Sequence, residues 1–372
     1  MPPRLAYLVS EDWYFVSHRL PMARAARDAG FEVHVITRVV NCGQRIEREG
    51  FVLHPIAWSR GSLHPLRTLA TLRAVRALYR ALKPDIVHHV ALVPSLIGST
   101  AALGLPMAKL NALAGLGFIF TSDSVKARLL RPIAVTVLRF LLNRPNTTVL
   151  VQNPDDATMV AKLGVARSRI AIIPGSGVDT DVLKPTPEPP APVTVGFVGR
   201  LLKDKGIVTL VRAHDLLRKR GAPVRILVAG TPDPSNPASI SQETLAAWRH
   251  HDGIEMLGHV SDIAGFWAKA HIAVLPSRRE GLPKSLLEAA ACGRPIVATD
   301  VPGCREVARQ GANALLVPVN DDAALANAIA ALAEDAGLRA QLGAAGRTLA
   351  ESEFSSARIG AAIVALYRKL LP

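Results

Sequence analysis

The stretch from residue 277 to residue 306 constrains the fold of this chain more than any other part of the sequence. It predicts a loop after a short buried strand (271–275), then a helix that ends at Gly293, then a second strand (295–299). Pro283 suits the first helical turn, where its missing N–H would have no partner. A helix start beyond a strand end offers free N–H groups and partial positive charge to an anion, above all to a phosphate.

Two carboxylates flank this helix start, Glu280 before it and Glu288 one turn into it. Because a carboxylate repels a phosphate, we expect both to accept hydrogen bonds from sugar hydroxyls. The pattern E-G-x-P-x-x-L-L-E-A-x-A-x-G-x-P-I-V-A-T resembles the donor-site motif of retaining family-4 glycosyltransferases. The resemblance implies two Rossmann-like α/β domains with a cleft between them (the GT-B fold), a nucleotide-sugar donor, Glu280 on its hexose and Glu288 on its ribose. The alternative is an ordinary strand–helix–strand unit with solvated glutamates.

The segment G-R-L-L-K-D-K-G (199–206) matches the pattern that supplies two cations to the donor diphosphate in this family, Arg200 and Lys205. A leaving diphosphate gains negative charge as the sugar bond breaks, and fixed cations stabilise that gain. The predicted catalytic residues are therefore Glu280, Arg200 and Lys205, and solvated loop charges are the alternative. The remaining donor-binding residues that the resemblance implies are Glu288, Gly281, Leu282, Lys284, Ser285, Leu287 and, in the loop 258–263, Val260.

The length of 372 residues predicts two domains, and alternating apolar strand-like and helix-like segments predict parallel sheets covered by helices. We expect an acceptor-binding domain over residues 1–184 and a donor-binding domain over 185–355. Five prolines within residues 184–192 predict a stiff linker between them. The C-terminal helix (about 356–372) should cross back onto the first domain, as it does in GT-B enzymes.

The net charge of +14 is concentrated in the first half of the chain. Residues 1–185 hold 23 Lys+Arg against 12 Asp+Glu (+11), and the remainder holds 21 against 18 (+3). This favours an anionic membrane surface over nucleic acid, because aromatic residues make up 5% of the chain and no nucleic-acid-binding signature is present. Arg73, Arg76, Arg80 and Lys83 recur at helical spacing, and a second basic, apolar helix is predicted over residues 126–144. The alternative is a plain surface helix.

The compartment is predicted from the cysteines and the N-terminus. Three widely spaced cysteines fit neither a disulfide framework nor a zinc site, and Arg4 leads directly into an apolar run that is not a signal peptide. We therefore expect a cytoplasmic protein, peripheral on the inner face of the plasma membrane.

Three polar residues in the first domain are candidates for the acceptor side of the cleft. His18 is predicted at the start of a helix (18–29) after a loop holding Trp13, Tyr14 and Phe15, in a His-Arg-Leu-Pro turn that resembles capsule and lipid-linked glycan transferases. His88 lies at the mouth of the strand 85–89, and Asn111 follows the strand 107–110, where many relatives place a histidine. Each has a structural alternative. Asp179-x-Asp181 resembles a turn that closes the first domain, so we predict no metal and no cofactor.

The function predicted from these residues is that of a retaining, metal-independent glycosyltransferase. It would move a hexose or N-acetylhexosamine from a UDP-sugar to a polyprenyl-diphosphate-linked sugar. The chain resembles transferases of surface polysaccharide assembly, including the type that acts on bacillosaminyl-diphospho-undecaprenol. A GT-B UDP-sugar epimerase is one alternative, and a non-catalytic relative that binds membrane or nucleic acid is another.

Overall fold

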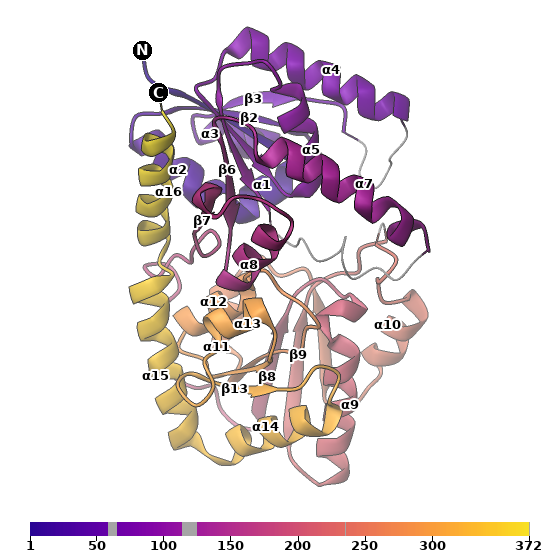
Figure 1. Cartoon of the computed structure of the whole chain (residues 1–372). Helices are drawn as coiled ribbons and strands as arrows, with labels where there is room; N and C mark the ends of the chain where they lie inside the picture. Colours follow the sequence, from indigo (N-terminus) through magenta and orange to yellow (C-terminus); the bar gives the residue numbers. More distant parts are fainter. Residues whose placement is uncertain (59–64, 114–124, 235, 372) are drawn as a thin grey trace. The chain divides into compact units, whose positions relative to one another are not determined.

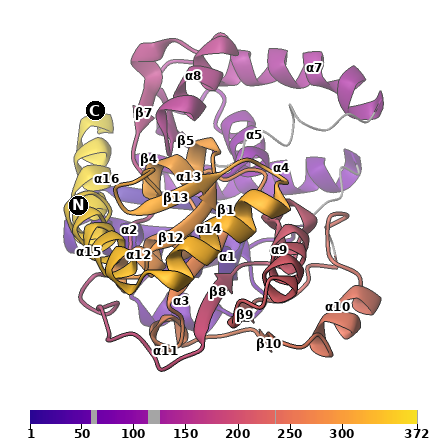
Figure 2. The ribbon, with the colours of Figure 1, turned by 90° about the horizontal axis from the view of Figure 1, so that it is seen from below.

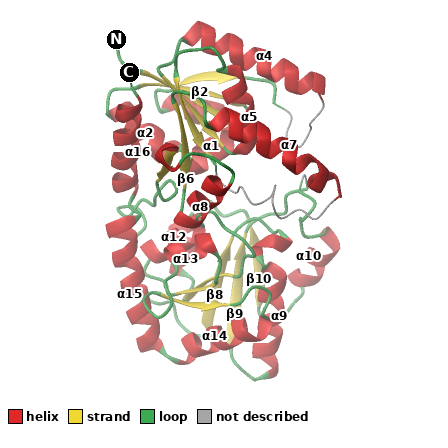
Figure 3. Cartoon of the chain, viewed as in Figure 1, coloured by secondary structure: helices red, strands yellow, loops and turns green. Residues whose placement is uncertain are grey.

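The computed structural model describes residues 1–58, 65–113, 125–234 and 236–371, without the side chains of 125–131 and 133. It divides into two compact units, unit 1 (Met1–Ser176 with Ser356–Pro372) and unit 2 (Gly177–Ser355). Each unit holds one parallel sheet covered by helices (Figure 1; Figure 3). Such sheets arise from apolar strands that alternate with amphipathic helices.

Unit 1 has a seven-stranded sheet in the order β3-β2-β1-β4-β5-β6-β7. Its strands are β1 (Arg4–Glu11), β2 (Glu32–Arg38), β3 (Val52–Pro55), β4 (Ile86–Val90), β5 (Ala108–Ala112), β6 (Thr147–Val151) and β7 (Ile170–Ile172). Its helices are α1 (Asp12–His18), α2 (Leu20–Asp28), α3 (Gly43–Arg48), α4 (Pro65–Leu82), α5 (Leu92–Ala101), α7 (Val125–Leu142), α8 (Pro154–Lys162), the short η1 (Arg167–Arg169) and α16 (Ser356–Leu370).

Both faces of the first sheet are buried. Because successive side chains of a strand point to opposite faces, each strand contributes residues to two cores. On β1, Tyr7 belongs to the core that α2 and α16 cover, and Leu8 belongs to the core under α4. The last helix, α16, packs closely against α2, since a Cβ added to Gly360 would lie 2.8 Å from the Cβ of Ala25. The C-terminal helix therefore completes the core of unit 1.

The predicted helix 18–29 is two helices, α1 and α2, and the predicted aromatic loop is part of α1. The reason is tertiary: Phe15 is fully buried, with its ring edge-on to Tyr7 and to Phe51. That burial is gained only when residues 12–18 form a helix against the sheet, so packing overrides the weak local signal.

Unit 2 has a six-stranded sheet in the order β10-β9-β8-β11-β12-β13. Its strands are β8 (Val193–Val198), β9 (Val224–Ala229), β10 (Ile254–Gly258), β11 (Ile272–Leu275), β12 (Ile296–Thr299) and β13 (Ala314–Val317). Its helices are η2 (Lys203–Lys205), α9 (Ile207–Lys219), α10 (Gln242–Arg249), α11 (Ile263–Ala268), α12 (Lys284–Ala291), α13 (Pro302–Val307), α14 (Asp322–Glu334) and α15 (Ala336–Glu353). Figure 2 views these helices around the second sheet.

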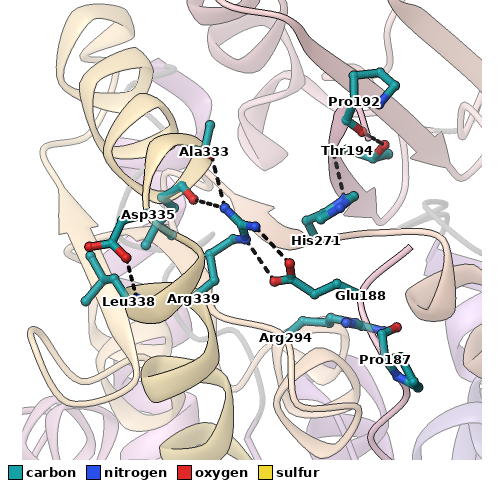
Figure 4. A network of polar contacts seen from close by, with 11 residues as sticks. Pro187, Glu188, Pro192, Thr194, His271, Arg294, Ala333, Asp335, Leu338 and Arg339 are labelled. Carbon is teal, nitrogen blue, oxygen red and sulfur yellow. Dashed lines mark hydrogen bonds and ion pairs between the residues drawn. The ribbon is translucent and has the colours of Figure 1, made fainter. Parts of the chain in front are cut away.

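The proline-rich stretch predicted as a spacer is packed into unit 2 (Figure 4). Arg339 on α15 donates two hydrogen bonds of 2.8 Å to the carboxylate of Glu188, and Arg294 donates to the Pro187 carbonyl. Upstream, Val178 and Leu183 join the core of unit 2. The division of the chain therefore lies after Ser176, eight residues before the predicted boundary at Lys184 (184 − 176 = 8).

The two basic helices predicted from sequence differ from expectation in detail. On α4, Arg73 and Arg80 are exposed, but Arg76 donates to the carbonyls of Ala101 and Leu103 at the end of α5. On α7, the basic side chains between 126 and 131 lie outside the described residues. Among the helices that the structure describes, none is long and apolar enough to span a bilayer.

Candidate functional site

The order of the second sheet creates a crevice between two neighbouring strands. β8 and β11 lie side by side at its centre, and the chain runs outward from them in opposite directions, through β9 and β10 on one side and β12 and β13 on the other. Ligands of open α/β sheets bind beyond the carboxyl ends of strands at such a switch point. The loop after β8 (199–206) carries the predicted cations, and the loop after β11 (276–283) carries the predicted carboxylate, so topology brings the two together.

These two loops touch through their backbones. Gly206 has φ +73°, and a Cβ there would lie 1.9 Å from the carbonyl oxygen of Pro276. The Arg278 N–H donates to the carbonyl of Asp204 over 2.9 Å. Only glycine permits both this left-handed conformation and this close approach, which explains the glycine that ends the 199–206 segment.

The contact continues in the side chains. The ammonium Nζ of Lys205 lies 2.6 Å from Oε1 of Glu280, and the hydroxyl of Ser277 donates to the same oxygen over 2.7 Å. The side chain of Glu280 is 8% exposed and that of Lys205 is 25% exposed, so the pair is partly shielded from water. Thr299 on β12 donates in turn to the Ser277 carbonyl, which fixes the start of the loop.

The other two predicted charges make different ion pairs. Arg200 donates to Oδ2 of Asp233 over 2.9 Å, and Nζ of Lys284 lies 3.2 Å from Oε1 of Glu288. Glu288 is buried, and burial raises the pKa of its carboxyl, whereas Lys284 acts in the opposite direction. No side chain caps the start of α12, where Lys284 is the first residue, and such a helix N-terminus favours anions; Glu288 lies one turn further on.

Two family models match the chain, one for each half. The model described as "Glycosyl transferase 4-like" matches residues 4–153, and the model described as "Glycosyl transferases group 1" matches residues 192–335. The chain belongs to the family-4 glycosyltransferases. The resemblance of the 280–299 motif to this family is thereby confirmed.

Relatives and a solved structure agree with this assignment. Over 354 residues (91% of this chain, 92% of the relative) the glycosyltransferase is 26% identical to the N,N'-diacetylbacillosaminyl-diphospho-undecaprenol alpha-1,3-N-acetylgalactosaminyltransferase of Campylobacter jejuni. It is 31% identical over 177 residues (48% of this chain, 46% of the relative) to the capsular polysaccharide biosynthesis glycosyltransferase CapM of Staphylococcus aureus. The Anabaena protein Alr3699/HepE, solved in complex with UDP and glucose, superimposes with a TM-score of 0.77 at 18% identity. The superposition covers 98% of this chain and 99% of the Anabaena protein. The GT-B fold predicted from sequence is confirmed.

The remaining donor-side residues of the glycosyltransferase differ in exposure. Gly281, Leu282 and Ser285 are half-buried around the start of α12. Leu287 is 1% exposed and belongs to the core of unit 2, so its side chain packs inward. Val260 also packs partly against that core.

The three candidates in unit 1 lie elsewhere than the sequence suggested. His18 is the last residue of α1 and not the start of a helix; its Nδ1 lies 2.5 Å from the Ser17 hydroxyl, and its ring stacks on Tyr14. His88 and Asn111 are fully buried inside β4 and β5.

Each of these two buried side chains is hydrogen-bonded at one atom, whereas Nε2 of His88 and Nδ2 of Asn111 have no hydrogen-bond partner among the described residues. Nδ1 of His88 lies 2.6 Å from the hydroxyl of Tyr367 on α16, and burial holds the pKa of His88 well below its usual value. Oδ1 of Asn111 accepts from the Ser99 hydroxyl and lies 2.8 Å from Nδ1 of His89. Both side chains lie inside their strands and not at a strand mouth.

Two further residues of the donor region were not predicted from sequence, Ser277 and Asp233. Each lies a few residues after the end of a strand of the second sheet, β11 for Ser277 and β9 for Asp233. This position is the only signal that the sequence offers for them. Asp179, considered above as a metal ligand, accepts from the backbone N–H groups of Asp181 and Val182 and so shapes a turn.

Proposed function

We propose that this glycosyltransferase is a retaining, metal-independent enzyme that uses a UDP-activated hexose or N-acetylhexosamine. The observation that carries the proposal is the contact of Lys205 with Glu280 at the switch point of the second sheet. Lys205 and Arg200 would bind the diphosphate and stabilise its growing charge, which makes a divalent metal unnecessary. The UDP bound to the similar Anabaena structure supports the choice of nucleotide.

In this proposal Glu280 is a positioning group for the sugar. Ser277 and Lys205 fix one carboxylate oxygen of Glu280, which leaves the second oxygen to accept from a sugar hydroxyl. Glu288, at the start of α12, would bind the ribose. Attack and departure on the same face of the sugar would need no carboxylate nucleophile beneath it.

The acceptor would be a polyprenyl-diphosphate-linked sugar, held at a membrane surface by the basic unit 1. The name of the Campylobacter relative includes such an acceptor, and the CapM relative belongs to capsule biosynthesis. Assembly of a surface polysaccharide or glycan precursor would follow. The excess of 23 Lys+Arg over 12 Asp+Glu in residues 1–185 supports the placement of an anionic lipid on this part of the chain.

The test is incubation of the purified chain with radiolabelled UDP-N-acetylgalactosamine, UDP-N-acetylglucosamine or UDP-glucose. Each is tested with and without an undecaprenyl-diphosphate sugar. The proposal expects label in the lipid fraction for one donor, with the α-configuration of the donor kept and with turnover unaffected by EDTA. An epimerised UDP-sugar formed without acceptor, or transfer with inverted configuration, would refute it.

A further inference from the structure

A basic cavity lies at the amino-terminal edge of the first sheet, away from the carboxyl ends of its strands. It measures about 320 Å³ and is formed by the end of α5, the following turn, the start of β5 and the segment between α7 and β6. Lys109 and Arg144 are its cations, and none of the described residues that line it is acidic. Its size is in the range of small-ligand sites.

Lys109 is the reason to regard this cavity as a binding site. It is the second residue of β5, and the alternation of the strand places it on the face opposite Ala108 and Leu110, which pack under α16. Its side chain is buried, with 9% of the residue exposed. Among the described residues, no carboxylate lines the cavity beside Lys109, and the one charged group that acts on its ammonium is Arg144.

A lysine side chain that is largely withdrawn from water beside no counter-charge is costly, and proteins usually pair it or lower its pKa. Here burial lowers the pKa of Lys109, and the neighbouring guanidinium of Arg144 lowers it further. Two cations on one cavity therefore disfavour each other until an anion joins them. This electrostatic conflict is relieved by a ligand that carries a phosphate group.

The cavity adjoins a second, larger groove that is mainly apolar. The groove measures about 800 Å³ and shares Leu105 and Asn146 with the basic cavity. Pro106, Met107 and Leu371 contribute apolar surface, and the cations Arg80, Lys83 and Lys369 stand on it. Its one carboxylate, Asp85, accepts a hydrogen bond from the backbone N–H of Arg4.

We propose that the basic cavity binds the phosphate of an anionic phospholipid whose hydrocarbon chain lies in the adjoining groove. A phosphate between Lys109 and Arg144 and an apolar chain along Leu105 and Met107 match the chemistry of the two spaces. Phe140, half-exposed beside the cavity with the Arg144 guanidinium 4.3 Å from its ring centre, adds apolar surface on that side. The proposal does not depend on the donor or acceptor assigned above.

The direct test measures binding of the whole chain to dioctanoyl phosphatidic acid and to inorganic phosphate by titration calorimetry. We expect the lipid to bind at least about tenfold more tightly than phosphate, because the chain adds apolar burial. Equal affinity for the two would show a free-anion site and would overturn the lipid. Absence of binding by both would overturn the proposal.

A pair of matched variants locates the site. Lys109→Met should weaken lipid binding about tenfold, since one charge-assisted contact is lost. Lys162→Met, at an exposed position of α8, removes the same charge and should leave affinity unchanged. If Lys109→Met lowers the melting temperature, Arg144→Gln provides a second variant at an exposed position. Equal binding by the Lys109, Arg144 and Lys162 variants would refute the site.

A second readout follows the lysine itself. After reductive ¹³C-methylation, the NMR signal of Lys109 can be titrated with pH. Its pKa should rise when dioctanoyl phosphatidic acid is added, because the phosphate supplies the missing counter-charge. An unchanged titration at saturating lipid would contradict the proposal.

Discussion

Lys205 and Glu280 are joined by an ion pair of 2.6 Å between two loops that leave neighbouring strands of the second sheet. Seventy-five residues separate them in sequence (280 − 205 = 75), and the closing of Gly206 onto Pro276 holds their loops together. In the function proposed above, this pair would provide a cation for the donor diphosphate beside a carboxylate for its sugar.

Glu280→Gln should reduce transfer by about two orders of magnitude while the chain stays folded. The amide keeps the shape of the side chain but loses the charge that binds Lys205 and the sugar hydroxyl. Loss of an interaction that is stronger in the transition state lowers the rate of transfer. Turnover with the UDP-sugar and lipid acceptor is the measurement. Glu255→Gln, at an exposed position of β10, is the matched control and should retain full activity.

Gly206→Ala should destabilise the chain more than Gly221→Ala does. Both glycines have positive φ (+73° and +75°), but a Cβ at position 206 meets the Pro276 carbonyl at 1.9 Å, whereas nothing lies within 4 Å of one at position 221. The backbone conformation alone costs roughly 1–2 kcal/mol in each variant. Denaturant unfolding measures the free energy of unfolding that each variant loses. The additional loss in Gly206→Ala reports the contact of the two loops, and equal losses in the two variants would mean that the contact is absent.

Ser277→Ala should raise the KM for the donor several-fold with a smaller effect on stability. The hydroxyl donates to the Glu280 oxygen that Lys205 also holds, so its loss leaves the carboxylate less well fixed. Steady-state kinetics against the donor is the measurement, and Ser277→Thr should restore part of the loss. An unchanged KM would show that Ser277 has no part in positioning Glu280.

The stability of the chain should fall below about pH 6.5, because its buried histidines are neutral in the fold. The pKa of His89 is lowered to about 4, chiefly by burial, so a histidine that binds a proton near pH 6.5 when unfolded does so only near pH 4 when folded. The contribution of neutral His89 to the free energy of unfolding is therefore fully present above about pH 6.5. It is lost as the pH falls toward about 4, by ~3 kcal/mol for His89 alone.

Denaturant unfolding between pH 7.5 and pH 4.5 measures this loss. His89→Gln removes the titrating group where Tyr79 and Asn111 provide hydrogen-bond partners, so its stability should change less with pH than that of the unaltered chain. Identical pH profiles of the two proteins would contradict the role given to His89.

The two loops that carry Lys205 and Glu280 were predictable because their signals are local. The 280–299 motif and the 199–206 segment each encode a loop and the start of a helix, and the parallel sheet then places them side by side. Asp233, the ion-pair partner of Arg200, and Ser277, the hydrogen-bond donor to Glu280, carry no such signal. Which carboxylate a flexible Arg200 or Lys205 selects depends on loops from other strands.

The first unit was harder to predict because some of its polar residues bind partners that are far away in the sequence. His88 looked like a strand-end residue, yet its partner is Tyr367, 279 residues later, on a helix that returns to unit 1. Likewise α1 forms because Phe15 packs on Phe51, not because residues 12–18 carry helix caps. Residues 177–184 belong to unit 2 for the same reason, since the carbonyls of Thr180 and Leu183 accept hydrogen bonds from Arg347 on a late helix.

The most direct test of the donor site compares Lys205→Met with Lys203→Met, an exposed lysine two residues earlier, by the shift in melting temperature that UDP and UDP-sugars cause. A ligand that binds only the folded chain raises this temperature. The unaltered chain and the Lys203 variant should show the same rise, and the Lys205 variant should show little or none. An equal rise in all three proteins would contradict the proposal that Lys205 binds the donor diphosphate.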